Sequence, residues 1–176
     1  CINANKYGWE GSRKIVDEKG FNTLTIAGDT KVVNASGKWA INFDGSGDYL
    51  SVSANVLNEL KSGDYTFEFF VEFSNIAAQQ VIWSKGGNWG FFGGQIFYVY
   101  TSGKLTWEFA NSSGTAWQFS KDQTSLGLPV ATSNTLYHLS FVRSGNSLKM
   151  FVNGTLGISG VVTSDHNDTS AYPLVF

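Results

Sequence analysis

Charged side chains are scarce in this chain of 176 residues, since only 15% of them are Asp, Glu, Lys or Arg. Ordinary soluble domains carry about a quarter. The 12 basic and 14 acidic residues leave a formal net charge of −2 at pH 7. Such a balance provides no basic surface for nucleic acid or for an anionic membrane, so we expect neither as a partner.

Cysteine is almost absent, because Cys1 is the only one. No disulfide can form within the chain, and the fold must depend on its core. Two interpretations of Cys1 stay open. It is either the lipid-bearing first residue of a mature bacterial lipoprotein or the end of a fragment of a longer chain, and the missing initiator Met favours the fragment. His138 and His166 are the only histidines, so neither a catalytic triad nor a zinc site has its parts.

Long apolar runs are also missing, and none approaches the roughly 20 residues of a membrane helix. We therefore expect no membrane insertion. The chain has only two Pro but 20 Gly, together with many Ser, Thr and Asn. This composition is typical of many short strands joined by tight turns. With 42% hydrophobic and 15% aromatic residues, the chain can bury the core of one domain.

The stretch 135–156 contains the clearest strand pattern. Residues 136–143 alternate between two faces, with Tyr137, Leu139, Phe141 and Arg143 on one of them. Residues 144–146 interrupt the pattern, and 147–152 form a second predicted strand. Asn153-Gly154 then precedes a third strand that starts at Thr155, and an Asn-Gly pair is the strongest short hairpin signal because both residues must take positive φ. Three antiparallel strands in a meander are predicted here.

The rest of the chain predicts further short strands, and residues 1–20 are interpreted as a linker and an entering strand. Residues 21–27 and 31–33 are predicted to form a hairpin around Gly28-Asp29, and residues 55–61 could form one or two helical turns. Without a long helix, this series favours an all-β, two-sheet antiparallel β-sandwich. The other predicted strands are 39–43, 49–52, 66–73, 80–84, 95–101, 104–110 and 115–120.

Four motifs carry a resemblance to a known family. They are AINFDGSGDYLSV (40–52), SGDYTFEFFVEF (62–73), VIWSKGG (81–87) and LYHLSFVRSGNSLKMFVNGTL (136–156). Together they resemble, in the same order, the laminin-G-like domains of the concanavalin A-like lectin and glucanase superfamily. The resemblance implies a jelly-roll sandwich over residues 21–176. It also implies a closing strand after residues 172–176 that is absent from this sequence, so we expect a longer parent protein.

The FDGSGDYL form of the motif, the low charge and the lack of disulfides look most similar to such domains in tailed-phage virion proteins and bacterial adhesins. The resemblance implies a non-enzymatic module of a larger virion or extracellular protein that binds carbohydrate on a cell surface and is oligomeric through its parent. Two alternatives stay open. One is a structural cement domain that packs on neighbouring virion subunits, and the other is an accessory module of a polysaccharide-degrading enzyme.

Glu68 and Glu72 are the pair to test for catalysis, because relatives of this fold include glucanases. They share one face of a predicted strand but are about 13 Å apart along it. Glycosidases need carboxyl groups about 5 to 9.5 Å apart. We therefore interpret both as non-catalytic and expect no enzyme. His138 matches a histidine that is structural in the family, and we expect it to be buried with its hydrogen bonds satisfied.

Two loop aromatics are the candidates for ligand binding. Trp89 lies in the Gly-rich stretch 86–94, and Trp117 follows the polar stretch that begins at Asn111. Flat aromatic rings stack on sugar rings, and neighbouring Asn and Ser side chains bond hydroxyl groups. The alternative, that each Trp fills one end of the core, stays open.

The stretch Asp44-Gly-Ser-Gly-Asp48 has oxygen-bearing side chains at alternate positions, as in calcium loops. It departs from the EF-hand pattern, because the sixth position is not Gly and Asn55 stands where a bidentate Glu belongs. We favour a polar turn between two strands. Asp44 and Asp48 stay weak metal candidates, with calcium as the ion, because family members often bind it.

Overall fold

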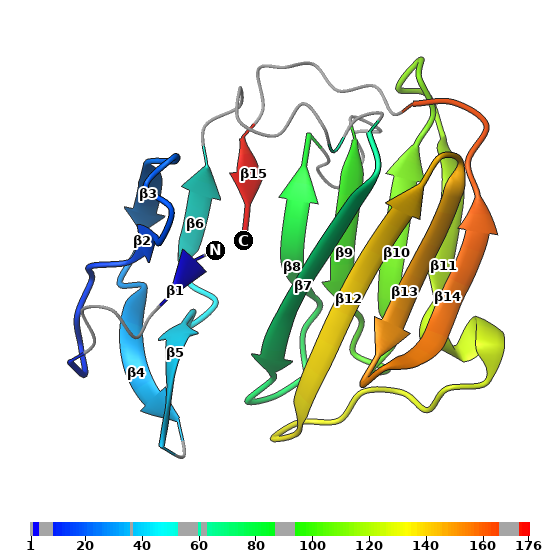
Figure 1. Cartoon of the computed structure of the whole chain (residues 1–176). Coiled ribbons are helices and arrows are strands. Elements are labelled where there is room, and N and C mark those ends of the chain that lie inside the picture. The colour runs from blue at the N-terminus through cyan, green and yellow to red at the C-terminus, as the bar shows by residue number, and fades with distance from the viewer. Residues whose placement is uncertain are drawn as a thin grey trace. The chain divides into compact units, whose positions relative to one another are not determined.

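The computed structural model describes residues 2–3, 9–35, 37–52, 60, 63–86, 94–165 and 173–176. Its strands pair antiparallel, and one short 3₁₀ helix, η2 (Gln123–Leu126), is defined in the described part of the chain (Figure 1). The predicted all-β fold is confirmed. The chain forms two compact units, residues 1–56 with 173–176, and residues 57–172. Over the described residues, no helix is long and apolar enough to cross a membrane.

In the first unit, strand β6 lies between β3 and β15, and two further pairs, β1 with β2 and β4 with β5, complete it. The core is small and aliphatic, built on Ile15, Val32 and Leu50. Residues 1–20 therefore supply two strands and one core side chain. The strands are β1 (Ile2–Asn3), β2 (Val16–Asp17), β3 (Leu24–Ala27), β4 (Lys31–Ala35), β5 (Lys38–Asn42), β6 (Tyr49–Val52) and β15 (Leu174–Val175).

The predicted hairpin around Gly28-Asp29 is wrong, because β3 pairs with β6 whereas β4 pairs with β5. A carboxylate from a later turn accounts for this. The backbone N–H of Asp29 donates to Asp48 Oδ1 at 2.7 Å. Gly28 has φ +63°, and a Cβ there would lie 2.8 Å from the Gly47 carbonyl oxygen. The turn thus packs against residues 47–48 and directs the chain from one sheet into another.

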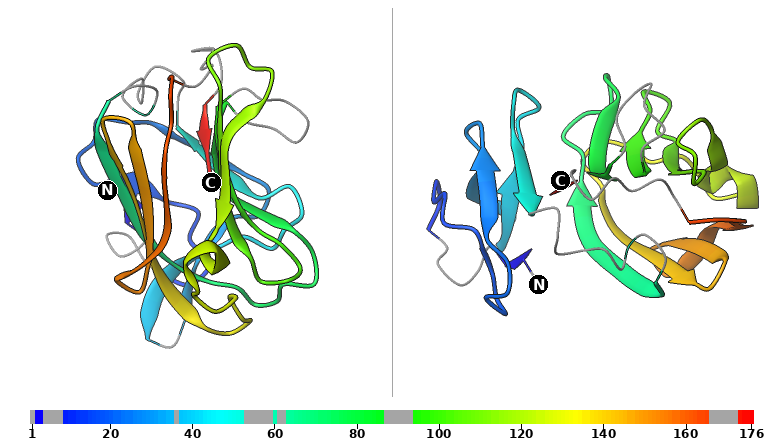
Figure 2. Two further views of the ribbon diagram at one scale, coloured as in Figure 1. Left: turned by 90° about the vertical axis from the view of Figure 1, so that its right-hand side faces the viewer. Right: turned by 90° about the horizontal axis from the view of Figure 1, so that it is seen from above.

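The second unit is a sandwich of two antiparallel layers, visible from above in the right-hand view of Figure 2. One layer has the strand order β14-β13-β12-β7, and in the other β8, β9, β10 and β11 are successive neighbours. The strands are β7 (Tyr65–Glu72), β8 (Gln80–Lys85), β9 (Gln95–Val99), β10 (Leu105–Ala110), β11 (Trp117–Asp122), β12 (Leu136–Ser144), β13 (Ser147–Val152) and β14 (Thr155–Val161).

An aromatic cluster around Phe141 of β12 joins the two layers. The Phe141 ring is fully buried. Its centroid lies 4.6 Å from that of Phe97, 5.2 Å from Trp107, 5.5 Å from Trp83 and 5.9 Å from Phe69. Edge-to-face contacts dominate, as expected for rings with opposite charge at face and edge. This cluster holds the sandwich together.

The predicted meander at 135–156 is confirmed as β12, β13 and β14. Asn153 and Gly154 take φ of 49° and 78°, as the turn between β13 and β14 requires. Leu139, Phe141 and Arg143, which the alternation placed on one face of β12, are buried, so the structure identifies this face as the inner one. The helical turns predicted at 55–61 lie outside the described residues, except Leu60.

Candidate functional site

The hairpin of β10 and β11 positions Trp117, one of the predicted ligand-binding residues. Phe109 pairs with Phe119 and both are buried, after which the register shifts and Ala110 pairs with Trp117. Paired residues of antiparallel strands point to the same side. Trp117 therefore lies on the outer side of the sheet, with Glu108, and is half-buried there. The interpretation that Trp117 fills the core is not supported.

Asn111 begins the turn between the two strands. Its Oδ1 accepts hydrogen bonds from the Thr115 backbone N–H at 3.0 Å and from Ser113 Oγ at 3.1 Å. Its Nδ2 donates to Thr115 Oγ1 at 3.1 Å. These bonds are local to the turn and use the amide to shape it. Asn111 thus fixes the turn that carries the exposed Ser113 and Thr115 and that leads into β11, where Trp117 begins the strand.

Glu108 and Ser120 are cross-strand partners on the same outer side, and Ser120 Oγ donates to Glu108 Oε1 at 2.9 Å. The phenol of Tyr98 is also on this side, because Tyr98 pairs with Thr106. Its hydroxyl group lies 3.2 Å from that of Tyr100. Burial raises the pKa of Tyr98, and the neighbouring Tyr100 and Glu108 raise it further. Tyr98 is therefore neutral at neutral pH, and with only 1% of its surface exposed it is not accessible to a ligand.

The sequence reasoning did not select Glu108, Ser120 or Tyr98. The alternation in β10, which assigns Glu108 to the opposite face from Trp107, was the available signal for the first of them. The other two come from neighbouring strands, so only the pairing reveals them. Glu108 and Ser120 form with Trp117 what we call the β10–β11 face: one indole, one carboxylate and one Ser hydroxyl group.

An ion pair lies at the other end of the β10–β11 face, where Lys104 Nζ is 3.0 Å from Asp122 Oδ2. Burial opposes ionisation of Asp122, but hydrogen bonds from Thr124 and Lys104 outweigh it and hold the pKa of this carboxyl below its usual value. Asp122 also caps η2. The pair is therefore structural, and its charges cancel.

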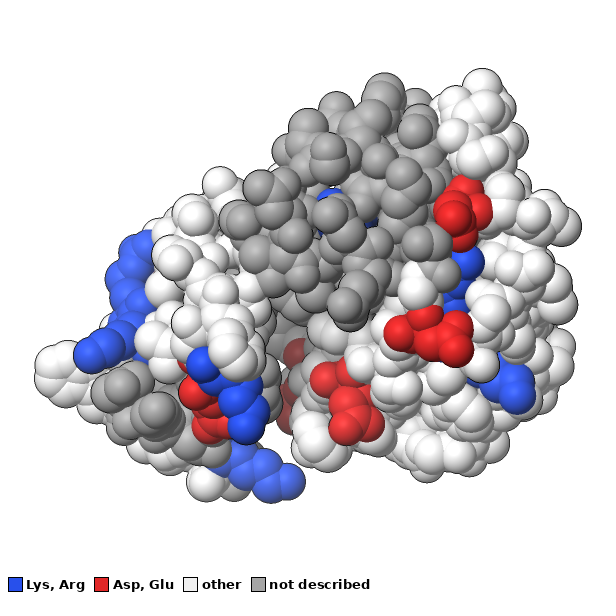
Figure 3. All heavy atoms as spheres, turned by 45° about the horizontal axis from the view of Figure 1, so that its top comes forward, with Lys and Arg blue, Asp and Glu red and all other residues white. Residues whose placement is uncertain are grey.

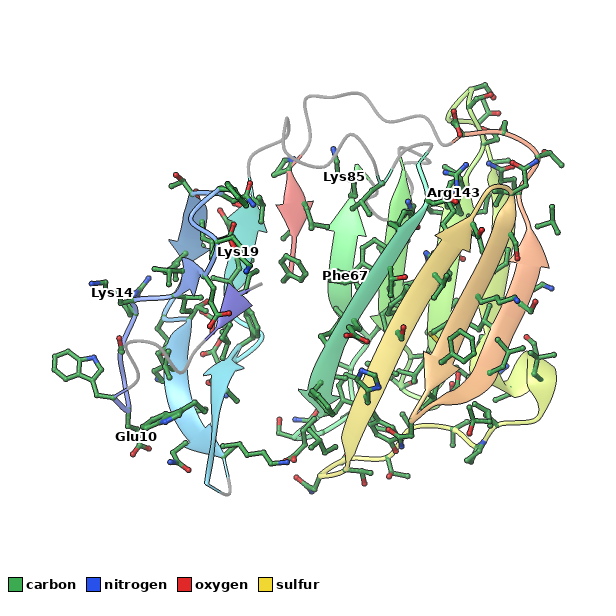
Figure 4. The ribbon with its side chains drawn as sticks, viewed as in Figure 1. Glu10, Lys14, Lys19, Phe67, Lys85 and Arg143 are labelled. Carbon is green, nitrogen blue, oxygen red and sulfur yellow. The ribbon has the colours of Figure 1, made fainter. Side chains whose placement is uncertain are left out.

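The hairpin is tied to the end of β14 by Gln118. Its Nε2 donates to the carbonyl oxygens of Ala110 at 2.7 Å and Ser164 at 2.8 Å, and its Oε1 accepts from the Thr163 N–H at 2.9 Å. Nearby, the buried Arg143 binds Asp165 Oδ1 at 3.0 Å and lies over the Phe109 ring (Figure 4). These contacts brace the hairpin that carries the β10–β11 face.

Trp89 lies outside the described residues, so its predicted role stays a prediction. Of the three predicted ligand-binding residues, the structure brings Asn111 and Trp117 into one hairpin. On the face of the molecule in Figure 3, acidic and basic side chains are interspersed among neutral residues.

Glu68 and His138 lie on the outer face of the other sheet of this unit. The prediction that His138 is buried is wrong, because 34% of its side-chain surface is exposed to solvent. Its Nε2 lies 3.4 Å from Glu68 Oε2, and its ring lies 4.8 Å from that of Phe70. Position 138 falls on the outer side of β12, where the two-residue period of a strand puts it.

In the first unit, Asp29 joins the two weak metal candidates, Asp44 and Asp48. One carboxylate oxygen from each lies within 4.8 Å of the others. Oxygen ligands at 2.3–2.6 Å from a calcium ion would have such spacings. However, Asp48 Oδ2 accepts from the Asp44 N–H at 2.8 Å and Oδ1 accepts from Asp29. Both oxygens of Asp48 thus bond backbone N–H groups of the turns, and the structure adds Asp29, from a distant part of the sequence, to the weak metal candidates Asp44 and Asp48.

Comparison with known proteins identifies the family. A model of the concanavalin A-like lectin/glucanases superfamily, of the laminin G type, matches residues 44–176. No curated protein matches the chain. Among solved structures, the receptor-binding domain of botulinum neurotoxin C/D mosaic serotype is similar, with a TM-score of 0.68 and 17% identity over 95% of this chain and 41% of that one.

Two further structures are similar in fold. Domain 4 of an extracellular arabinanase from Geobacillus stearothermophilus, in complex with arabinotriose, has a TM-score of 0.61 and 12% identity, over 88% of this chain and 72% of that one. The binding domain of botulinum neurotoxin DC, in complex with rat synaptotagmin II, has a TM-score of 0.63 and 12% identity, over 95% of this chain and 42% of that one. The chain thus spans about two fifths of the neurotoxin domains that it matches. It belongs to the laminin G-type family of the concanavalin A-like lectin/glucanases superfamily.

Proposed function

We propose that this chain is a non-enzymatic recognition module that binds carbohydrate through the β10–β11 face. The observation that carries the proposal is the position of Trp117 beside Glu108 and Ser120 on the outer side of a braced hairpin. An indole offers a flat apolar surface for a sugar ring, while the carboxylate and hydroxyl groups bond sugar hydroxyls. Because the hairpin is already braced, little conformational entropy is lost on binding.

Proteins of similar fold that bind carbohydrate support this function. The arabinanase domain was solved with arabinotriose, and cell entry of botulinum neurotoxin type C is described as dependent on two ganglioside molecules. In our proposal the module belongs to a larger virion or extracellular protein, on the resemblance of its FDGSGDYL motif to phage and adhesin domains.

A binding experiment tests the proposal. We would screen the chain on a glycan array that includes arabinotriose and measure the affinity for the best ligand by calorimetry. We expect Trp117→Ala to weaken binding at least tenfold, since stacking is lost. Trp9→Ala is the matched control, because Trp9 is 72% exposed and lies in the first unit. Equal affinities of the wild type and Trp117→Ala, or no binding to any glycan, would refute the proposal.

The non-enzymatic part has its own test. We would measure reducing-sugar release from laminarin and other β-glucans with purified protein, and we expect none above the blank. Turnover that disappears in Glu108→Gln, Glu68→Gln or Glu72→Gln would show that the module is a hydrolase.

A further inference from the structure

Strand β7 carries an acidic and aromatic pattern that the β10–β11 face does not use. Glu68, Phe70 and Glu72 alternate with buried or half-buried residues and point to the outer face of the sheet. Phe70 is 69% exposed, although it lies in the middle of β7, which pairs with β12 along its whole length. Solvent-facing strand positions are normally polar, so an exposed ring between two carboxylates invites a functional explanation.

The neighbouring strand extends this pattern. On β12, His138 is opposite Phe70 and Leu136 is opposite Glu72. Leu136 is 43% exposed. We call Glu68, Phe70, Glu72, Leu136 and His138 the β7–β12 patch (β7 and β12 are adjacent in Figure 1). The patch combines two exposed carboxylates with two exposed apolar side chains, Phe70 and Leu136.

The charge of the β7–β12 patch is not balanced by Lys or Arg. Within the described part of the chain, Glu68 has an ion pair only with His138, and no ion pair is found for Glu72. In the same sheet, Lys149 of β13 pairs with Val142 of β12. Val142 pairs in turn with Thr66 of β7. Lys149 is thus two strands away from β7, about 10 Å at the usual strand spacing.

We propose that the β7–β12 patch is a docking site for a Lys or Arg side chain of a protein partner. A cation above the Phe70 ring is attracted by the ring face. Residues two apart on a strand are about 6.6 Å apart, so Glu68 and Glu72 flank that position on both sides. A guanidinium group bonds carboxylates in a planar fork and stacks on aromatic rings. Its aliphatic stem would lie on Leu136.

A peptide titration tests the site. We would add acetylated tri-arginine amide to the ¹⁵N-labelled chain and follow amide shifts by NMR, with tri-citrulline as the uncharged probe of the same shape. We expect saturable shifts in residues 68–72 and 138 with tri-arginine only. Glu68→Gln/Glu72→Gln should weaken binding at least tenfold, and Phe70→Leu, which keeps an apolar side chain, should weaken it several-fold.

Glu10→Gln/Glu18→Gln is the control, because it removes the same charge from the first unit. Equal weakening by the two double variants would mean general electrostatic attraction and refute the site. Binding of tri-citrulline as tight as that of tri-arginine, shifts located elsewhere, or no saturation would refute it too. The glycan measurements on Trp117→Ala are separate, so this site and the proposed carbohydrate function can fail independently.

Discussion

The two faces of strand β7 carry the same residue type with opposite surroundings. Phe67 and Phe69 point inward and contact Phe141, with centroids 6.3 Å and 5.9 Å away. Phe70 points outward and is 69% exposed. Burial and packing of an inward ring stabilise the folded state. The outward ring of Phe70 adds little to this stability, so its presence is explained better by binding than by folding. Hydrophobicity alone therefore does not identify the core of this module.

The largest expected effect comes from deleting a ring on the inner face. Phe141→Ala should lower the free energy of unfolding by about 3–5 kcal/mol, because it leaves a cavity among its aromatic neighbours. Phe70→Ala should change it by less than about 0.5 kcal/mol, as exposed substitutions usually do. Chemical denaturation of both variants measures the difference. Similar losses in the two variants would break the distinction between the faces.

The turn between β13 and β14 helps to fix the strand register, which decides which side chains point inward. A slip of one residue would exchange inner and outer side chains, for example Met150 and Lys149. Gly154→Val puts a β-branched side chain at φ 78° and should cost about 1–3 kcal/mol. Thr155→Val, in the adjacent strand position, is the control and should be tolerated. Unchanged thermal stability of Gly154→Val would contradict the turn assignment.

The smallest expected effect comes from comparing two carboxylates, that of Asp48 in a turn and that of the exposed Glu68. Backbone N–H bonds from Asp44 and Asp29 hold the pKa of Asp48 below its usual 3.8, with burial opposing them. A lowered folded pKa stabilises the fold above the unfolded pKa, and this contribution is lost as the pH falls through the folded value. Asp48→Asn should therefore lower stability at pH 7 and flatten its decline below about pH 4.

Glu68 supplies the comparison, because its side chain is 63% exposed, and Glu68→Gln should change the free energy of unfolding at pH 7 by less than about 0.5 kcal/mol. Unfolding curves at pH 7 measure both variants, and curves between pH 2 and 7 compare Asp48→Asn with the wild type. An acid profile of Asp48→Asn that coincides with that of the wild type would show that the turn does not depend on the carboxylate.

Local signals predicted most of the strands. Alternation and the Asn153-Gly154 pair were sufficient for β12 to β14, because a two-residue turn and its flanking strands are set by neighbours in the sequence. The same reasoning failed at Gly28-Asp29. There the deciding contact comes from Asp48, which is distant in sequence, and a turn signal does not reveal which strands it separates.

The candidate site divides in the same way. The sequence by itself determined the all-β class, the division of β12 into two faces and the choice of Trp117, since these follow from residue type and a period of two. Only the tertiary structure decided that Trp117 shares a face with Glu108 and Ser120, because a register shift in β11 sets its side. The tertiary structure also showed which face of β12 is the inner one, placed His138 beside Phe70 and Glu68, and brought Asp29 to Asp48. Contacts between strands depend on register and sheet order, which no local pattern specifies.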